Sequence, residues 1–461
     1  MALKVFEQSA QVKEMAQNWP IAAALLGGTR AMRAAGERFL PSWPNEDGEA
    51  YRARLSTATL FPAFARTLGV MAGKPFAKQL TYGEDVPANI REWCDDIDLE
   101  GRNLHTFASE LMEESLGYGI AGVLVDYPRV EGVRTVAEER AIGARPYFVK
   151  ITHDQILGWR STKRNGVTVL TQLRLAETAE VEDGEYGTAT VNRVRVLAPG
   201  AWELWEETRE GGYHLIDEGV TTLSEIPFVP FYGRRTGFMM GVSPLLDLAY
   251  LNVKHWQSQS DQDTILHVAR VPILAMIGAE DGASLTVGAS TAVKLPLGAD
   301  LKFVEHSGAA IQAGQESLEK LQDQMIQTGA ELLMPKPGQR SATEANNDAE
   351  ANKSELQRIV EAFEDSLDQC LWFMAQWVGQ DDGGRVSLFK DFGAGSLSDA
   401  AGQLILAFQQ SGLITKRTAI IQAQRIGVLA PDIDPDDEIE AVDAEGPSLG
   451  MIDGIGERTA A

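Results

Sequence analysis

The sequence predicts an α+β fold, in which a β-rich segment is flanked by helices. Helical patterns separated by loops fill residues 1 to about 80. Residues 117–232 then hold several short strand-like runs, together with Asn165-Gly166, a strong hairpin signal because both residues tolerate a positive φ. From residue 243 onward the pattern is that of long helices with turns between them. Strands gathered in one segment and helices in others are typical of α+β proteins.

Length and composition bound the class of protein. A chain of 461 residues exceeds what one compact core usually organises, so two to four structural regions are expected. Apolar residues make up 44%, which excludes global disorder. The first 20 residues carry Glu7, Lys13 and Glu14 and lack the apolar core of a signal peptide. Since no apolar run approaches the roughly 18–20 residues of a bilayer span, we expect a soluble protein made in the cytoplasm.

Charge and cysteine content exclude further classes. The chain has 41 basic and 66 acidic side chains and a net charge of −25, which opposes tight phosphate binding over the whole surface. A net negative charge is still compatible with a protein that lets DNA slide past without binding it. The two cysteines, Cys94 and Cys370, are too few for a disulfide scaffold or a cysteine metal site. Cys370 lies in an apolar helical stripe and is expected to be buried.

The N-terminal half gives a helical and then a strand-like pattern. We expect one helix over Tyr51–Ala72, ended by Gly73-Lys-Pro75, and another over residues 104–116. Gly119–Tyr127 is a short apolar run closed by Pro128, which suits a buried strand. Further strand-like segments cover 147–151, 167–175, 188–197 and 202–206.

A long helix is expected over Ser243–Arg270, with Ser243 as its N-cap and Pro244 in its first turn. Its centre, Gln257–Asp263, is polar all round. A long helix with such a centre is rare inside a monomer, so we expect it to face a neighbouring subunit or water. Pro272 ends it, and short strands follow at 272–277, 292–295 and 301–304.

A second pair of helices follows. Ile311, Leu318, Leu321, Met325 and Leu332 recur at helical spacing and form one narrow stripe. After a loop rich in proline, the capping-box pattern Ser341/Glu344 opens a helix expected to reach residue 378, about 55 Å at ~1.5 Å per residue. Two shorter helices are expected within 396–430, the second capped by Thr415. The chain is acidic after Ala430 and is expected to be a mobile tail beyond about 440.

Motifs for catalysis, metals and cofactors are absent or weak. Gly69…Gly73-Lys74-Pro75 approaches a phosphate-binding loop, but it is one residue short and has proline where the hydroxyl belongs. The six histidines lack close metal-ligand spacing; His255 and His267 share a helix, where a solvated or interface role is expected. Asp95-Asp96 and Glu113-Glu114 are adjacent, so each pair points to different helix faces. We expect no catalytic residue, no metal and no cofactor.

Lys336 and Arg340 are the basic pair to consider. They lie in the loop Met334–Arg340, between two long helices and thus at the tip of a helical hairpin. One interpretation is a solubilising pair on a surface loop, which is the more common case. The other is a loop that contacts DNA phosphates.

Several stretches, taken in order, resemble tailed-bacteriophage portal proteins, and more narrowly an uncharacterised portal-like branch. Leu60–Pro75 (LFPAFARTLGVMAGKP) is similar to the helix before the portal wing, and Tyr118–Tyr127 (YGIAGVLVDY) looks like the wing strand that follows. Ile226–Pro230 and Gly241–Leu245 resemble the entry into the first stem helix, and Gly412–Arg417 with Arg425–Leu429 resemble the C-terminal helix pair. The likeness spans about residues 50–440. The chain departs from the family in its short clip and small crown.

The resemblance implies a division of the chain and a function. The implied regions are an N-terminal helical segment (1–80), an α/β wing (81–243), a first stem helix (244–270), a clip (271–306), a second stem helix (307–333), a channel loop (334–345), a spine helix (346–380), a helical crown (381–440) and an acidic tail (441–461). It implies a non-enzymatic ring, usually of twelve copies, at one capsid vertex of the virion, through which double-stranded DNA is packaged and ejected. The implied partners are the terminase large subunit, the capsid or scaffold protein and head-completion proteins, with no membrane. Another virion structural or adaptor protein, and an acid–base hydrolase, remain as alternatives.

Overall fold

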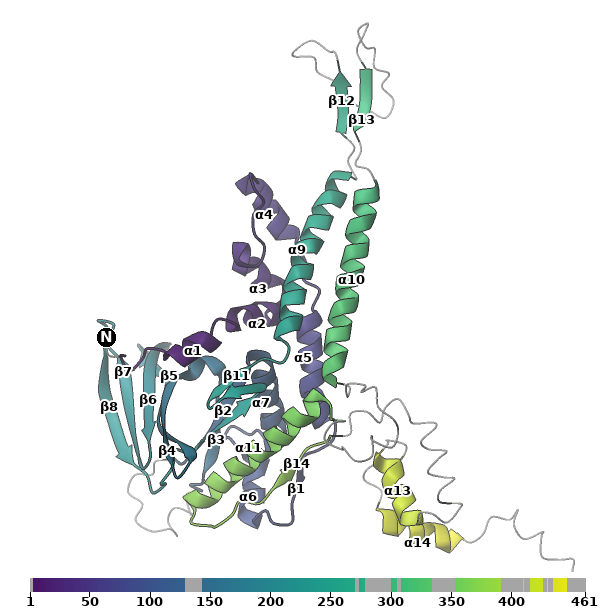
Figure 1. Cartoon of the computed structure of the whole chain (residues 1–461). Coiled ribbons are helices and arrows are strands. Elements are labelled where there is room, and N and C mark those ends of the chain that lie inside the picture. The colour runs from purple at the N-terminus through teal and green to yellow at the C-terminus, as the bar shows by residue number, and fades with distance from the viewer. Residues whose placement is uncertain are drawn as a thin grey trace, which may run out of the picture. The chain divides into compact units, whose positions relative to one another are not determined.

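The computed structural model describes residues 3–128, 143–269, 273–277, 300–304, 308–333, 353–390, 409, 415–425, 429 and 434–445. The chain divides into two compact units, residues 1–388 and 389–461. The first unit combines helices with β-sheets, so the predicted α+β class is confirmed (Figure 1).

Five helices begin the first unit, and their boundaries correct one prediction. They are α1 (Ala10–Met15), α2 (Trp19–Leu26), α3 (Gly28–Ala35), α4 (Gly48–Thr57) and α5 (Ala63–Gly73). The single helix expected over Tyr51–Ala72 is broken, because Ala58 is extended (ψ 133°) and Pro62 precedes α5. The helix stop at Gly73-Lys-Pro75 is confirmed, since only a 3₁₀ turn, η2 (Lys74–Phe76), follows.

Two larger sheets and three small strand pairs make up the β structure. The three-stranded sheet has the order β3-β2-β9 and the five-stranded sheet the order β4-β5-β6-β7-β8, all antiparallel. Their bounds are β2 (Ile120–Asp126), β3 (Tyr147–Ile151), β4 (Ile156–Arg164), β5 (Val167–Asp183), β6 (Gly187–Ala198), β7 (Ala201–Glu207), β8 (Tyr213–Val220) and β9 (Phe228–Tyr232). The small pairs are β1 (Thr81–Tyr82) with β14 (Val386–Ser387), β10 (Arg234–Gly237) with β11 (Met240–Val242), and β12 (Ile273–Ile277) with β13 (Asp300–Val304).

The predicted hairpin at Asn165-Gly166 is confirmed. Both residues have positive φ, 51° and 85°, and they join β4 to β5. β5 is longer than the segment expected at 167–175, because its pairing with β6 continues from Leu173↔Leu197 to Asp183↔Gly187. The edge strands β4 and β8 had no predicted counterpart.

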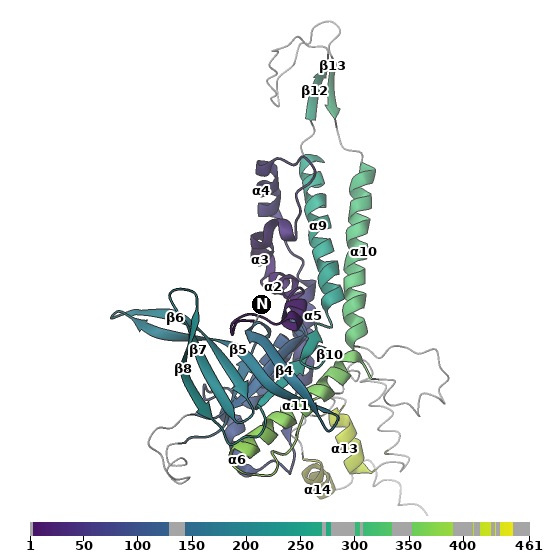
Figure 2. The ribbon, with the colours of Figure 1, turned by 60° about the vertical axis from the view of Figure 1, so that its left-hand side comes forward.

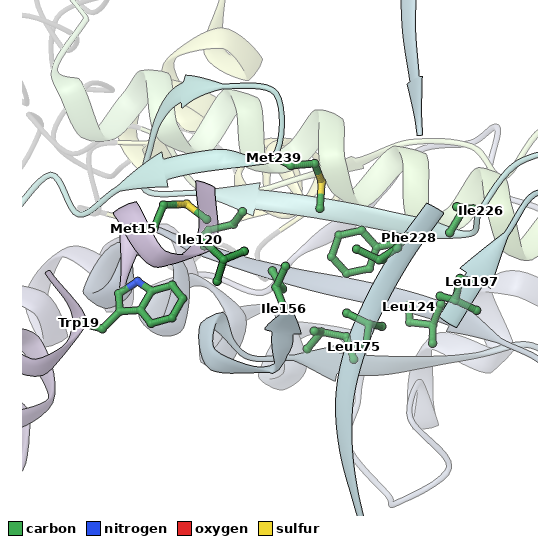
Figure 3. Packing of buried hydrophobic residues seen from close by; sticks show 13 residues of the cluster. Met15, Trp19, Ile120, Leu124, Ile156, Leu175, Leu197, Ile226, Phe228 and Met239 are labelled. Carbon is green, nitrogen blue, oxygen red and sulfur yellow. The ribbon is translucent and has the colours of Figure 1, made fainter. Parts of the chain in front are cut away.

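One apolar core joins the two larger sheets (Figure 3). Its members come from the N-terminal helices, both sheets, the segment before β9 and the β10–β11 turn. They include Met15, Trp19, Ile120, Leu124, Ile156, Leu175, Leu197, Ile226, Phe228 and Met239. Packing is tight enough that a Cβ added at Gly122 would lie 2.2 Å from Phe228 Cζ. Because Met15 of α1 and Trp19 of α2 belong to this core, both helices are held against the same apolar residues as the strands.

Helices complete the first unit. α6 (Ala88–Trp93) and two 3₁₀ turns, η1 (Gly36–Arg38) and η3 (Cys94–Asp96), are short. α7 (Leu104–Tyr118) matches the helix expected over 104–116, and Asn103 Oδ1 caps it by accepting from Thr106 N at 2.9 Å. α9 (Leu246–Ala269) and α10 (Gly308–Leu333) agree closely with the two helices expected there. Both cysteines are buried, as predicted for Cys370.

Two predictions near the C-terminus need correction. The helix expected to open at Ser341/Glu344, and the spine helix expected over 346–380, correspond to α11 (Glu355–Trp377). Ser354 caps it in a capping box with Gln357, so the helix begins later than predicted, and Ser341 lies outside the described residues. In the second unit, α14 (Pro435–Glu445) is a helix where a mobile tail was expected from residue 441.

The second unit also contains α13 (Lys416–Arg425), which Thr415 caps as predicted by accepting from Thr418 N at 3.1 Å. None of the helices in the described part of the chain has the length and apolar content to span a membrane.

Candidate functional site: the α9–α10 helix pair

α9 and α10 lie side by side along their length in both views (Figures 1 and 2). They are antiparallel, because Gln262 meets Ile311 while His255, two turns earlier, meets Gln322. Leu318, Leu321, Met325 and Leu332 are all buried, so the predicted stripe is the packing face of α10. At ~1.5 Å per residue the 24 residues of α9 extend about 36 Å. In chain order, β12 and β13 connect the far ends of the pair.

The polar centre of α9, Gln257–Asp263, is only partly buried. Ser260 and Gln262 are buried, as are Asn252 and His255 nearer the start of the helix, whereas Asp263 is exposed. Two glutamines of the centre bond to the backbone of segments packed around α9. Gln262 Nε2 donates to Ile311 O at 2.9 Å, and Gln257 Nε2 donates to Phe39 O at 3.1 Å.

Asn252 has a distinct role in this arrangement. Its Nδ2 donates to Phe61 O at 2.9 Å, and its Oδ1 accepts from Phe64 N at 3.0 Å. Phe64 lies in the first turn of α5, where backbone N–H groups lack partners within the helix. Pro62, at the N-cap position, offers no side-chain cap. Asn252 on α9 therefore supplies the cap of α5 from nearly 190 residues away.

His255 is a buried titratable group between α9 and α10. Its Nε2 lies 3.2 Å from Gln322 Nε2, and the ring packs 5.4 Å from the Phe61 ring. His255 Nδ1 is buried and has no hydrogen-bond partner among the described residues. Burial lowers the pKa of His255. The expected solvated or interface role of His255 was wrong.

We predict that acid weakens the fold through His255. Its folded pKa lies below the unfolded value of about 6.5, so below that pH the unfolded chain takes up a proton that the folded chain resists. Stability present above pH 6.5 is therefore lost as pH falls toward the folded pKa. The melting temperature of His255→Gln should fall less between pH 7.5 and 5 than that of wild type. His214→Gln, at an exposed position on β8, is the control; equal slopes for all three proteins would contradict the prediction.

Three glycines join the α9–α10 pair to the sheets. Gly119 ends α7 with φ 93°, and a Cβ there would lie 2.6 Å from Val242 Cα. A Cβ on Gly241 would lie 2.2 Å from Gly119 O, and one on Gly233 would lie 2.6 Å from Ser115 O. Gly233 N donates to Gly119 O at 3.0 Å. Backbone thus packs directly on backbone at this glycine joint (Gly119, Gly233 and Gly241).

Ser243 fixes the start of α9 to the same joint. Its Oγ donates to Leu116 O, near the end of α7, at 2.7 Å and accepts from Leu245 N at 3.1 Å. The capping role predicted for Ser243 is confirmed, and the structure adds the bond to α7. The direction of α9 is therefore set by the end of α7.

The basic pair predicted as a DNA contact, Lys336 and Arg340, lies outside the described residues. The adjacent carboxylates do not converge. Glu113 is exposed, whereas Glu114 Oε1 contacts His153 Nδ1 at 2.6 Å; Asp96 accepts from Gly101 N and Arg145, whereas Asp95 is exposed. His153 is enclosed between Tyr118, stacked at 3.6 Å, and Trp19 at 4.7 Å. Among the described residues, no three His, Cys, Asp or Glu side chains could hold a metal ion.

A groove of about 940 Å³ beside α11 was missed by sequence reasoning. Its apolar wall includes Phe228, Phe238, Ile359 and Phe363, which come from β9, the β10–β11 turn and α11. At its edge Arg234 pairs with Glu355, with Nη2 and Oε1 2.5 Å apart. The apolar stripe of α11 indicated a buried face, but it could not indicate that part of this face lines an open groove.

One comparison with known proteins, a family model, falls on the same helices. Residues 244–378 match a family model described as "Domain of unknown function (DUF4055)", which covers α9, β12, β13, α10 and α11 and well under half of the chain. No curated protein matches.

Three solved structures that match the chain come from gene transfer agent (GTA) particles. One is "Neck of empty GTA particle computed with C6 symmetry", with 14% identity, a TM-score of 0.45, and coverage of 78% of this chain and 89% of the other. "Neck of native GTA particle computed with C12 symmetry" has 14% identity, a TM-score of 0.42, and coverage of 87% and 98%. "Virion of native gene transfer agent (GTA) particle" has 14% identity, a TM-score of 0.42, and coverage of 79% and 89%.

Proposed function

We propose that this chain is the portal subunit of a tailed-phage-like particle. It forms a non-enzymatic ring, of twelve copies, at one capsid vertex and serves as the channel for packaging and ejecting double-stranded DNA. The terminase large subunit docks on the ring during packaging and head-completion proteins replace it afterwards, while the capsid or scaffold protein holds the ring in the virion.

One observation carries the proposal: the order of elements. An α/β part leads through the glycine joint into α9, then through the β12–β13 pair into the antiparallel α10, and then into α11. This is the order of wing, stem, clip, second stem and spine that the sequence resemblance implies. The charge of −25 is also consistent with a channel, because like charge keeps the duplex from adhering to the wall.

The proposal predicts a ring, which negative-stain imaging with mass photometry of the purified protein tests directly. We expect particles with a central hole and a mass near twelve times 50.1 kDa. A chain that stays monomeric, alone and with its capsid partners, would contradict the portal function and favour a monomeric adaptor.

The portal function also makes a prediction for the loop between α10 and α11. We propose that Lys336 and Arg340 contact DNA phosphates in the channel, where a few cations give weak, salt-sensitive contacts. The double variant Lys336→Ala/Arg340→Ala should form rings as wild type does and package or retain less DNA. Wild-type packaging and retention by that variant would exclude this role.

A further inference from the structure

The hairpin formed by β5 and β6 extends beyond the other strands of its sheet. β5 pairs with β4 only as far as Leu175, and β6 pairs with β7 only from Arg193 onward. Past these points, out to the pair Asp183↔Gly187, the two strands pair only with each other among the described residues (Figure 2). We call residues 178–192 the β5–β6 ribbon. A two-stranded ribbon alone is marginally stable in water, so packing against a partner would stabilise it.

The β5–β6 ribbon is acidic on one face and apolar on the other. Glu180 and Glu182 alternate with Ala179 and Val181 along β5, so the two kinds of side chain point to opposite faces. Residues 178–192 contain four carboxylates and no cation, and no described residue forms an ion pair with any of the four. Tyr186, at the end of the ribbon, is 93% exposed. The ribbon therefore carries a net charge of −4 that nothing in the described part of its own chain neutralises.

The hairpin at the other end of β5 is basic. Residues 158–170, which we call the β4–β5 hairpin, contain Arg160, Lys163 and Arg164 and no carboxylate. All three cations are exposed, and the described residues give none of them an ion pair. The groove beside α11, which this hairpin helps to line, does not cancel the charge, because its lining has four cations and four carboxylates. Val167, at the turn of the hairpin, is 64% exposed.

The acidic and basic ends cannot meet within one copy. β5 has 17 residues and is about 55 Å long at ~3.3 Å per residue, with one hairpin turn at each end. Two complementary surfaces at opposite ends of one rigid element favour contact between copies, the acidic end of one against the basic end of another. Such a contact joins two different surfaces, so it is heterologous and can repeat from copy to copy until a ring closes.

We propose that the β5–β6 ribbon of one copy packs on the β4–β5 hairpin of the next copy in the ring. The carboxylates of the ribbon then meet the three cations of the hairpin, and Tyr186 and Val167 are the exposed apolar side chains available on the two sides. This inference rests on the proposed ring and adds to it a contact between the five-stranded sheets of neighbouring copies.

Charge reversal of one end at a time tests the contact. One triple variant makes both ends acidic: Arg160→Glu/Lys163→Glu/Arg164→Glu. The other makes both ends basic: Glu180→Lys/Glu182→Lys/Glu185→Lys. In each variant alone we expect the fraction of protein in rings, measured by mass photometry at about 0.1 M salt, to fall about tenfold or more, because like charges then meet at every contact. Circular dichroism and melting curves show whether each variant is folded.

A matched control separates this contact from a general effect of net charge. Glu84→Lys/Glu92→Lys/Glu113→Lys changes the net charge by the same amount as the ribbon variant, at exposed carboxylates of the first unit outside both hairpins. We expect the control to form rings as wild type does. A control that loses its rings to the same extent as the ribbon variant would contradict the contact.

Mixing the two triple variants is the decisive experiment. The acidic ribbon of one variant then meets the basic hairpin of the other, and the basic ribbon meets the acidic hairpin, so we expect rings with an even number of alternating subunits to return. Wild-type rings with both triple variants unaffected would overturn this contact and leave the portal function standing. A wild type that stays monomeric, alone and with its capsid partners, would overturn the portal function and the contact with it. Intact rings of the hairpin variant that retain less DNA would overturn the contact and assign the hairpin to nucleic acid.

Discussion

Gly119→Ala is expected to lower the free energy of unfolding by about 3 kcal/mol or more, with a corresponding fall in the urea midpoint. Gly119 holds φ 93°, which an alanine adopts only at a cost of about 1 kcal/mol. The added Cβ would also lie 2.6 Å from Val242 Cα and C, which are backbone atoms and cannot rotate away. The two costs add, because relief of the contact would move β11 and with it the start of α9.

A matched glycine on a helix gives the control. Gly69 lies on α5, is exposed, and has open space where a Cβ would be built. Gly69→Ala should therefore raise the free energy of unfolding by roughly 0.5–1 kcal/mol, because alanine restricts the unfolded chain and favours helix. If the two variants shift the midpoint equally, the glycine joint does not constrain the fold as described.

Asn252→Ala is the second large expected effect, a loss of about 2 kcal/mol of stability. The substitution removes the amide that bonds to both segments: Phe64 N loses its acceptor, while Phe61 O keeps only the bond from Ala63 N at 2.9 Å. An orphaned buried group costs about 1–3 kcal/mol. Because Phe64 N belongs to the first turn of α5, the loss should appear first as fraying of that helix, measured as faster amide exchange over Ala63–Leu68.

Lys254→Ala is the comparison on the same helix. Lys254 is exposed on α9, two residues from Asn252, so its loss should change stability by less than about 0.5 kcal/mol. Protection of the α5 amides that is unchanged in Asn252→Ala would show that α5 does not depend on a cap from α9.

The elements that could be predicted from the sequence are those that depend only on neighbouring residues in the chain. The α10 stripe was correct because leucine and methionine spacing alone defines a packing face, and Asn165-Gly166 was correct because positive φ is a property of those two residues. Ser243 and Thr415 were assigned as caps for the same reason.

Some of the elements that were wrong depend on distant partners. The polar centre of α9 suggested exposure, but Gln262 is buried and both Gln257 and Gln262 bond to backbone atoms, at Phe39 and Ile311, which no local pattern reveals. The break between α4 and α5 was missed although Pro62 marks it locally. The cap of α5, by contrast, comes from Asn252 and could not be found locally. The start of α11 at Glu355 depends on a capping box, Ser354 with Gln357, that the sequence reading overlooked.

The glycine joint also decides how force travels through the chain. Between α7, β9 and β11 no side chain separates the backbones at Gly119, Gly233 and Gly241, so no rotamer change can absorb a displacement there. Ser243 adds a direct link from α9 to the end of α7. A displacement of the start of α9 is therefore transmitted directly to β2 and β9. We expect a tilt of α9 to be accompanied by a tilt of the three-stranded sheet.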